Sequence, residues 1–122
     1  MSSKIIWRTI ADALIESGFD VYPPATKNGE CKSKYIVVKT AGSTQLSNYS
    51  TEQHFYNILL YVPQNEYDEL EEFKNEVVKA INEKLFPLLM PTGQEQPDFF
   101  DDSYKAHVIS IQYRNNVRNK YL

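Results

Sequence analysis

Residues able to carry out chemistry are few in this 122-residue chain, and their spacing matches no common metal site. Cys31, His54 and His107 stand apart, without the His-x-x-x-His or Cys-x-x-Cys pairs that bring ligands to one metal ion. The two histidines fall in predicted strands that could be neighbours, so strand pairing alone could bring them together. We expect a structural or surface role for each histidine, with no bound metal and no cofactor.

Nucleophilic and acid–base catalysis also find little support in the sequence. A cysteine nucleophile needs a lowered pKa in a shaped pocket, whereas Cys31 lies in the polar stretch from Lys27 to Lys34, which predicts an exposed loop. Asp101 and Asp102 are adjacent acids in a predicted loop, with no identifiable partner for proton transfer. We therefore predict that the protein is not an enzyme. A glycine-rich phosphate loop is lacking too, because the glycines are scattered singly at Gly18, Gly29, Gly42 and Gly93.

The composition predicts one soluble domain over residues 1–122. Apolar residues make up 42% and aromatic residues 13% of the chain, which is enough for a single core. The net charge of −3 argues against general binding to nucleic acid or to anionic membranes, because such binding depends on clustered Lys and Arg. A lone cysteine excludes an intrachain disulfide, and no stretch has the roughly 20 apolar residues of a membrane-spanning helix. The N-terminal residues lack a signal-peptide pattern, so we expect synthesis in a cytoplasm.

Hydrophobic periodicity predicts two helices and about four strands. In the most informative stretch, from Glu52 to Leu85, a strand that is apolar on both faces ends at Pro63, and an acidic amphipathic helix capped by Asn65 follows. Two helices on one face of a mainly antiparallel sheet would bury these apolar stripes, which is an α+β sandwich. The predicted elements are a helix over Ser3–Ser17, strands over Phe19–Tyr22, Tyr35–Ala41, Glu52–Val62 and Ala106–Arg114, a helix from Asn65 to Leu85, a hairpin tip at Ser43–Thr51, a long loop at Phe86–Tyr104 and a basic C-terminal tail at Asn115–Leu122.

Charge is distributed unevenly along the second half of the chain. Between Glu66 and Asp102 there are eleven acidic residues and only three lysines. From Ser103 to Leu122 there are four basic residues and no acid. One interpretation is a solvated helix face and a solubilising tail. The other is a pair of complementary surfaces that meet between neighbouring copies, as a head-to-tail ring requires.

The order of elements and several short phrases resemble one protein family. An N-terminal helix is followed by Val21-Tyr22-Pro23-Pro24, by Tyr35-Ile36-Val37-Val38, by a polar hairpin, by the strand Phe55 to Pro63, by a covering helix and by a closing strand, Ile109 to Arg114. Over most of its length the chain is similar to the tail terminator, or tail completion, proteins of long-tailed bacteriophages. The resemblance implies an α+β subunit without an active site. Such a subunit forms a hexameric ring that caps the tail tube, stops its polymerisation and offers a docking face to the head connector.

The resemblance also implies partners and contact regions. The partners would be other copies in the ring, the tail tube protein and the head–tail connector, with no membrane and no sequence-specific nucleic acid, and the location would be the tail or neck of a virion. In the hairpin and the long loop, the predicted contacts with tube or neighbour are Gln45, Asn48, Tyr49, Phe99 and Phe100. From the charge distribution, the predicted subunit interface joins Glu69, Glu72 and Glu76 of one protomer to Arg114, Arg118 and Lys120 of the next.

Two other functions stay open from the sequence. A different head–tail joining subunit, such as a connector or stopper, would share the size and the virion context. A small cytoplasmic enzyme or nucleic-acid-binding module would instead use His54, His107 and Cys31. Steeply salt-dependent binding to nucleic acid would favour the second of these.

Overall fold

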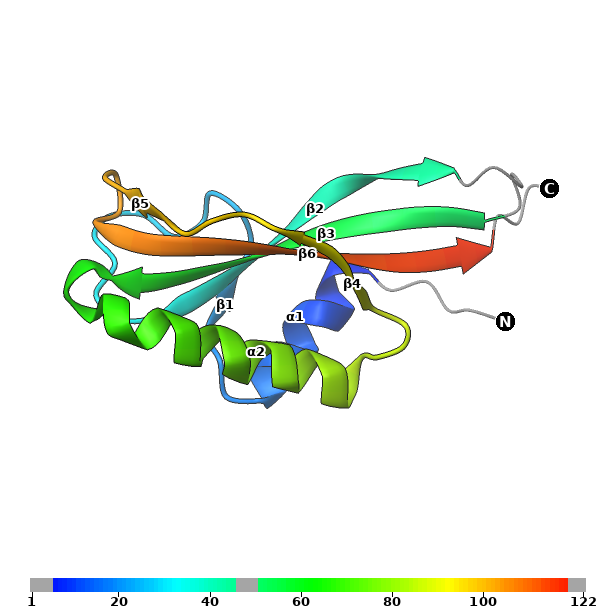
Figure 1. Cartoon of the computed structure of the whole chain (residues 1–122), viewed down its shortest axis with the longest axis horizontal. Coiled ribbons are helices and arrows are strands. Elements are labelled where there is room, and N and C mark those ends of the chain that lie inside the picture. Colours follow the sequence, from blue (N-terminus) through cyan, green and yellow to red (C-terminus); the bar gives the residue numbers. More distant parts are fainter. Residues whose placement is uncertain (1–5, 46–50, 119–122) are drawn as a thin grey trace.

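The architecture is α+β, with helices on one side of a twisted sheet (Figure 1). The computed structural model describes residues 6–45 and 51–118, and within these ranges the chain forms two α-helices, one 3-10 helix and six strands. The elements in chain order are α1 (Trp7–Glu16), β1 (Val21–Tyr22), β2 (Tyr35–Gln45), β3 (Thr51–Pro63), the 3-10 helix η1 (Gln64–Glu69), α2 (Leu70–Lys84), β4 (Met90–Glu95), β5 (Phe99–Asp101) and β6 (Ala106–Arg118). None of the helices in this described part is long and apolar enough to cross a membrane.

The sheet has the strand order β1-β2-β3-β6-β4, and β5 pairs with the same side of β6 as β4 does. Strand β1 runs parallel to β2, and the other pairings are antiparallel. The predicted number of about four strands was therefore too low, since the described residues form a mixed sheet of six strands. The difference arises in the segment 86–104, which was predicted as a loop but contributes the edge strands β4 and β5.

Strands β3 and β6 form the centre of the sheet and pair without interruption from Thr51 opposite Arg118 to Pro63 opposite Ala106. The alternation predicted for the last strand is confirmed, because its odd-numbered residues from Ile109 to Tyr113 join the core under the helices. The strand is longer than predicted, since the residues from Asn115 to Arg118 continue the pairing and are not a tail.

The core lies between the sheet and the two helices. Tyr56, Ile58, Leu60 and Val62 of β3 are at most 5% exposed, and they pack in one cluster with both helices. Helix α2 supplies the predicted apolar stripe to this cluster, and α1 adds a shorter one. The helical residues in this cluster are Ile10, Leu14, Leu70, Phe73, Val77, Ala80 and Ile81.

Helix boundaries differ from the predictions for local reasons. Helix α1 begins at Trp7, and it ends in a Schellman arrangement in which Gly18 has φ 96° and the Phe19 N–H bonds to the Leu14 carbonyl at 3.1 Å. Asn65 does not cap α2. Instead η1 precedes it, and Glu66 at φ −123° and ψ 32° interrupts regular helical geometry there.

The three long strands extend beyond the layer of helices. Figure 1 shows β2, β3 and β6 continuing to the right of α1 and α2, whereas η1 and β5 lie at the left end of the molecule. The extension consists of Ser43–Gln45, Thr51–Phe55 and Arg114–Arg118, and it is joined by backbone pairing on both sides of β3. We call these residues the strand extension.

Truncation of a core residue in the central strand should be costly. Ile58 is fully buried and belongs to the cluster beneath the helices. We expect Ile58→Ala to lower the free energy of unfolding by about 3 kcal/mol, because it removes buried methyl groups and leaves a cavity. Ile15→Ala is the control, since Ile15 is 50% exposed, and it should change the stability by less than about 0.5 kcal/mol. Urea denaturation of both variants checks the difference, and equal losses would contradict the assigned core.

Candidate protein-interaction site

The residues that could carry out chemistry are kept apart by the fold. His54 pairs with Asn115, and His107 pairs with Val62, so the two histidines lie eight positions apart along the β3–β6 ladder, about 26 Å. The His54 Nε2 atom lies 3.2 Å from a Glu52 carboxylate oxygen. In residues 6–45 and 51–118 no three His, Cys, Asp or Glu side chains are grouped so that they could hold a metal ion.

Cys31 is buried, and the prediction of an exposed cysteine was wrong. Its side chain is 3% exposed, its Sγ donates to the Ser33 carbonyl at 3.3 Å, and its backbone N–H bonds to the Tyr104 carbonyl at 2.7 Å. The last bond holds the polar segment over the sheet face opposite the helices. Burial raises the pKa of the Cys31 thiol, which is opposite to what an activated nucleophile requires.

Four tyrosines cover the sheet on this side. Tyr35 stacks on Tyr61 with ring centroids 4.7 Å apart, and Tyr22 and Tyr104 meet this pair edge-on. The Lys27 ammonium lies 5.0 Å from the centroid of the Tyr22 ring. Burial raises the pKa of Tyr61 and of Tyr35, so these phenols stay neutral and serve packing.

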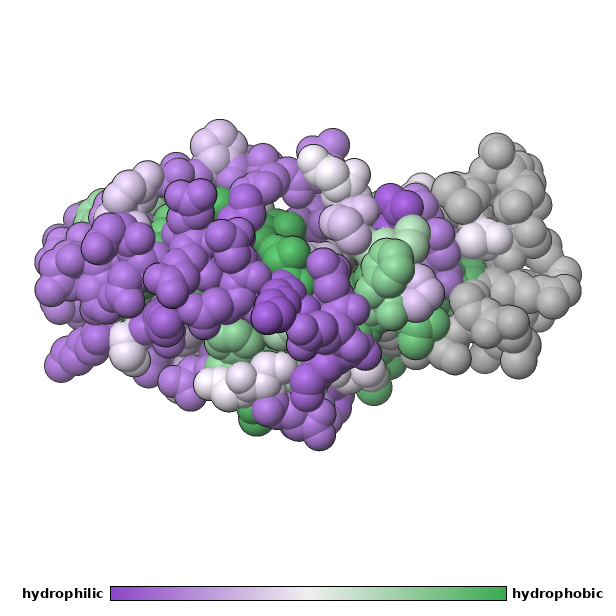
Figure 2. Space-filling view, turned by 60° about the horizontal axis from the view of Figure 1, so that its bottom comes forward, coloured by the Kyte–Doolittle hydropathy of each residue, from purple (hydrophilic) through white to green (hydrophobic). Residues whose placement is uncertain are grey.

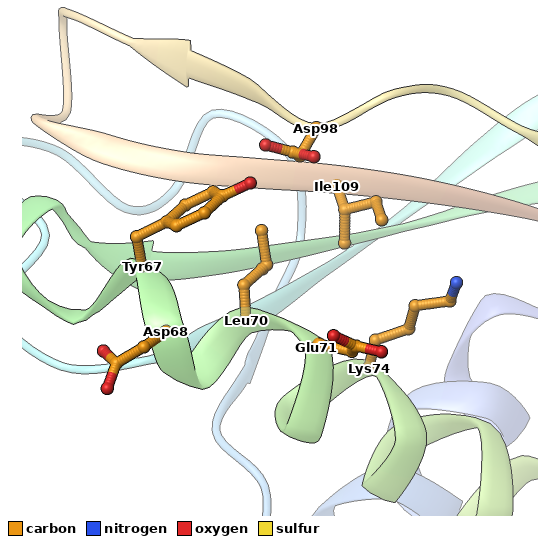
Figure 3. A pocket seen from close by; sticks show the side chains of 7 residues that line it. All are labelled: Tyr67, Asp68, Leu70, Glu71, Lys74, Asp98 and Ile109. Atoms are coloured by element: carbon orange, nitrogen blue, oxygen red, sulfur yellow. The ribbon is translucent and has the colours of Figure 1, made fainter.

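A cleft of about 290 Å³ lies at the opposite side of the sheet, between the start of α2 and the β5 edge (Figure 3). Its apolar floor is formed by Leu70 and Ile109, which are 5% and 9% exposed. The 3-10 helix places Tyr67 at one side, and the connection between β4 and β5 places Asp98 at the top in Figure 3. The lining residues of this Tyr67 cleft are Tyr67, Asp68, Leu70, Glu71, Lys74, Asp98 and Ile109.

The Tyr67 cleft is negatively charged. Its lining carries three carboxylates and one ammonium group, and the Lys74 ammonium forms an ion pair with Glu95 of β4. A hydrogen bond to Asp98, together with the charge of that carboxylate, raises the pKa of Tyr67. The phenol therefore stays protonated and holds Asp98 beside the opening of the cleft.

Exposed aromatic residues occur in the cleft lining and in the strand β5 that follows Asp98. Tyr67, Phe99 and Phe100 are 51%, 47% and 44% exposed. The His107 ring lies edge-on between Tyr67 and Phe100, at centroid distances of 4.7 and 5.2 Å. Because Phe100 pairs with His107 and Phe99 with Val108, these two predicted contact residues point to opposite faces of β5. Tyr67 was not predicted from the sequence as a site residue. A single aromatic residue among the acidic residues at the start of a predicted helix was a signal that could have identified it.

The charged residues predicted for a subunit interface are not brought together within one protomer. Glu72 and Glu76 are exposed on α2, and a hydrogen bond to Glu66 raises the pKa of Glu69 at the end of η1. At about 100° per residue, Glu72 and Glu76 lie about 100° to 160° around α2 from Glu71 and Lys74, which line the cleft. Arg114 lies on the other face of the sheet.

Several predicted site residues fall outside what the structure describes. Asn48, Tyr49 and Lys120 lie outside the described residues. Gln45 and Arg118 are the last residues of β2 and β6, and their side chains are likewise outside the described part. Their roles in contact and interface stay predictions.

The buried thiol predicts a slow reaction with modifying reagents. With Cys31 3% exposed and its pKa raised by burial, native protein at pH 8 should react with a thiol reagent at least about 100-fold more slowly than protein unfolded in urea. A time course with a chromogenic disulfide reagent measures both rates. Native and unfolded rates within a few-fold of each other would show that the segment around Cys31 does not cover it.

Buried phenols predict a loss of stability at alkaline pH. Burial raises the pKa of Tyr113 to about 12, so the folded state keeps a proton that the unfolded state loses near pH 10. This contribution is complete below pH 10 and falls away as the pH rises to 12. We expect Tyr113→Phe to make the decline in unfolding free energy shallower by up to about 1.4 kcal/mol per pH unit in that window. Urea denaturation from pH 8 to 12 tests this, and an unchanged slope would contradict it.

Comparison with known proteins adds no relative from which a function can be transferred. The amino-acid sequence matches no protein-family model, and no curated protein matches it at a significant level. The function proposed below therefore rests on the sequence resemblance described above and on the residues and surfaces of this chain.

Proposed function

We propose that this protein is a structural subunit that assembles with copies of itself into a ring, most simply a hexamer, at the end of a phage-type tail tube. The ring ends the polymerisation of the tube and offers the surface that joins it to the head. The proposal starts from the resemblance of the chain to tail terminator proteins, and it is supported by two features of the surface.

The separation of complementary charges is the observation that carries the proposal. Glu72 and Glu76 are exposed on α2, whereas Arg114 of β6 lies on the sheet face away from the helices. Figure 2 shows that hydrophilic residues dominate the helix side of the molecule. Surfaces that are complementary but distinct form head-to-tail contacts, and such contacts close into rings when the rotation between neighbours permits it.

Both charged surfaces have capacity for partners. Glu72 and Glu76 make no ion pair within the described part of the chain. Arg114 donates through Nη1 to the Pro91 carbonyl at 3.4 Å, and its Nε has no hydrogen-bond partner among the described residues. Arg114 also lines a hollow of about 270 Å³ with Pro87, Leu88, Met90 and Asn116. Exposed pairs of this kind set register more than they add stability.

The strand extension is the second supporting feature. It continues past α1 and α2, so no helix covers its two faces in Figure 1. In the extension β3 is paired on both sides, and the three strands together offer an uncovered, continuous surface to another protein. We assign the contact with the tube to this end, where the predicted contact residue Gln45 ends β2.

Catalysis by Cys31, His54 and His107 is disfavoured. The thiol is buried with a raised pKa, and the two histidines are about 26 Å apart along the strands. We therefore expect no enzymatic reaction that depends on these three residues.

Light scattering and electron imaging test the proposal directly. The purified chain, alone and mixed with tail tubes, should give rings in solution or rings seated at tube ends. Light scattering after size-exclusion chromatography gives the number of subunits. A protein that stays monomeric in both conditions and never attaches to tubes would overturn the proposal.

Charge reversal tests the interface. Glu72→Lys with Glu76→Lys should weaken ring assembly about 10-fold or more at low salt, because two attractive pairs become repulsive. Arg114→Glu with Arg118→Glu should do the same, and combining all four changes should restore assembly. Asp12→Lys with Glu30→Lys is the matched control, since both side chains are exposed and neither belongs to the predicted interface. If this control weakens assembly as much as Glu72→Lys with Glu76→Lys, net charge and not a specific interface governs association.

A further inference from the structure

We propose that the Tyr67 cleft binds an arginine or lysine side chain from a protein of different sequence, and that an apolar neighbour of this basic residue packs on Phe100. The inference rests on the proposed function, in which each ring subunit meets copies of itself on its charged surfaces and other virion proteins at its ends.

Charge complementarity identifies a cation as the ligand. The lining carries Asp68, Glu71 and Asp98 against Lys74, whose ammonium is already paired with Glu95. Figure 3 shows Asp98 on one wall and Glu71 on the other, while Asp68 points away to the left. A basic group that enters between Asp98 and Glu71 meets carboxylates from both the sheet edge and the helix layer.

The shape and the apolar surfaces select a long side chain over a simple ion. Leu70 and Ile109 form a nearly buried floor, against which the methylene groups of Arg or Lys can pack while the charged end reaches a carboxylate. The Tyr67 ring adds an aromatic face for cation–π contact. That ring is held in place by its edge-on contact with His107 and its hydrogen bond to Asp98. The site is therefore formed before a partner arrives, which lowers the cost of binding.

An exposed aromatic residue extends the site beyond the cleft. Phe100 is 44% exposed and touches the same His107 ring as Tyr67. Anchoring residues at protein interfaces combine an aromatic contact with a desolvated charge. A segment with a basic residue beside an aromatic or aliphatic one satisfies both parts of this surface.

The position of the cleft points to a partner other than a copy of this chain. Glu72 and Glu76, which are assigned to neighbouring copies, lie about 100° to 160° away around α2 from Glu71 and Lys74. Arg114 lies on the other face of the sheet from Ile109. Neither surface of the proposed ring contact includes the cleft. Figure 1 places η1 and β5 at the end of the molecule opposite the strand extension. A subunit that meets the tube through its extension thus presents the cleft to a different protein.

A peptide titration tests the ligand class. The probe is the capped peptide Ala-Phe-Arg-Ala, compared with the same peptide in which citrulline, neutral and nearly the same shape, replaces arginine. In ¹H–¹⁵N NMR spectra of the full chain at low salt, the arginine peptide should shift the amides of Tyr67, Asp98 and Ile109 with millimolar affinity. The citrulline peptide should bind at least about 10-fold more weakly, because it lacks the charge. Equal binding of both peptides, or no shifts at 5 mM arginine peptide, would overturn the inference.

Matched variants separate this site from the ring interface. Glu71→Gln with Asp98→Asn should weaken binding of the arginine peptide about 10-fold and leave ring assembly unchanged, whereas Glu72→Gln with Glu76→Gln should weaken the ring and leave peptide binding unchanged. If the cleft variant loses ring assembly, a second copy occupies the cleft, and the assignment to a different protein is wrong while the proposed function stands. If the peptide binds as expected but no ring forms alone or on tubes, the proposed function fails and the cation site remains.

Discussion

The fold depends on the register of the central strand β3. It pairs with β6 over its full length and with β2 on its other side, so its alternation fixes which residues of three strands face the helices. If the pairing slipped by one residue, Ile58 and Leu60 would point to the sheet face that carries the four tyrosines. The apolar faces of the helices would then lie against Asn57 and Leu59. Because both faces are covered by different layers, the register is specified twice: by the helices on one face and by the Cys31 segment on the other.

Elements with strong periodicity were predictable from the sequence, and elements that depend on distant partners were not. Strand β3, the stripe of α2 and the alternation of β6 follow from local patterns that persist over many residues. Strands β4 and β5 carry Pro91, Gly93 and Pro97 in or between them and have no such pattern. They become strands because the open edge of β6 supplies backbone partners. Cys31 was misplaced for the same reason, since its polar neighbours indicate exposure and only the distant Tyr104 carbonyl holds the segment down.

The same distinction between local and distant determinants applies to the residues of the candidate site. The exposure of Phe99 and Phe100 and the solvent-facing position of Glu72 and Glu76 agree with the local sequence. Only the structure shows that Phe99 and Phe100 point to opposite faces of β5. The Tyr67 cleft is a tertiary feature. Its walls come from η1 and the start of α2 and from the connection between β4 and β5, which are distant in sequence. From the local sequence, Tyr67 resembles any other solvent-exposed residue of a helix. It becomes part of a site only because the segment leading into β5 lies beside it.

Strand β6 connects the two ends of the molecule that are assigned different partners. Its first residues pair with β5 beside the Tyr67 cleft, and its last residues belong to the strand extension. Near the second end, the fully buried Asn115 donates from Nδ2 to the Leu88 carbonyl at 2.8 Å, which ties the connection after α2 to the strand. A buried polar bond of this kind favours one arrangement over others. The paired strand and the anchored end of α2 therefore belong to one rigid unit. If the proposed contact with a tube is made by the strand extension, its orientation on the tube would also set the direction in which the cleft faces a second partner.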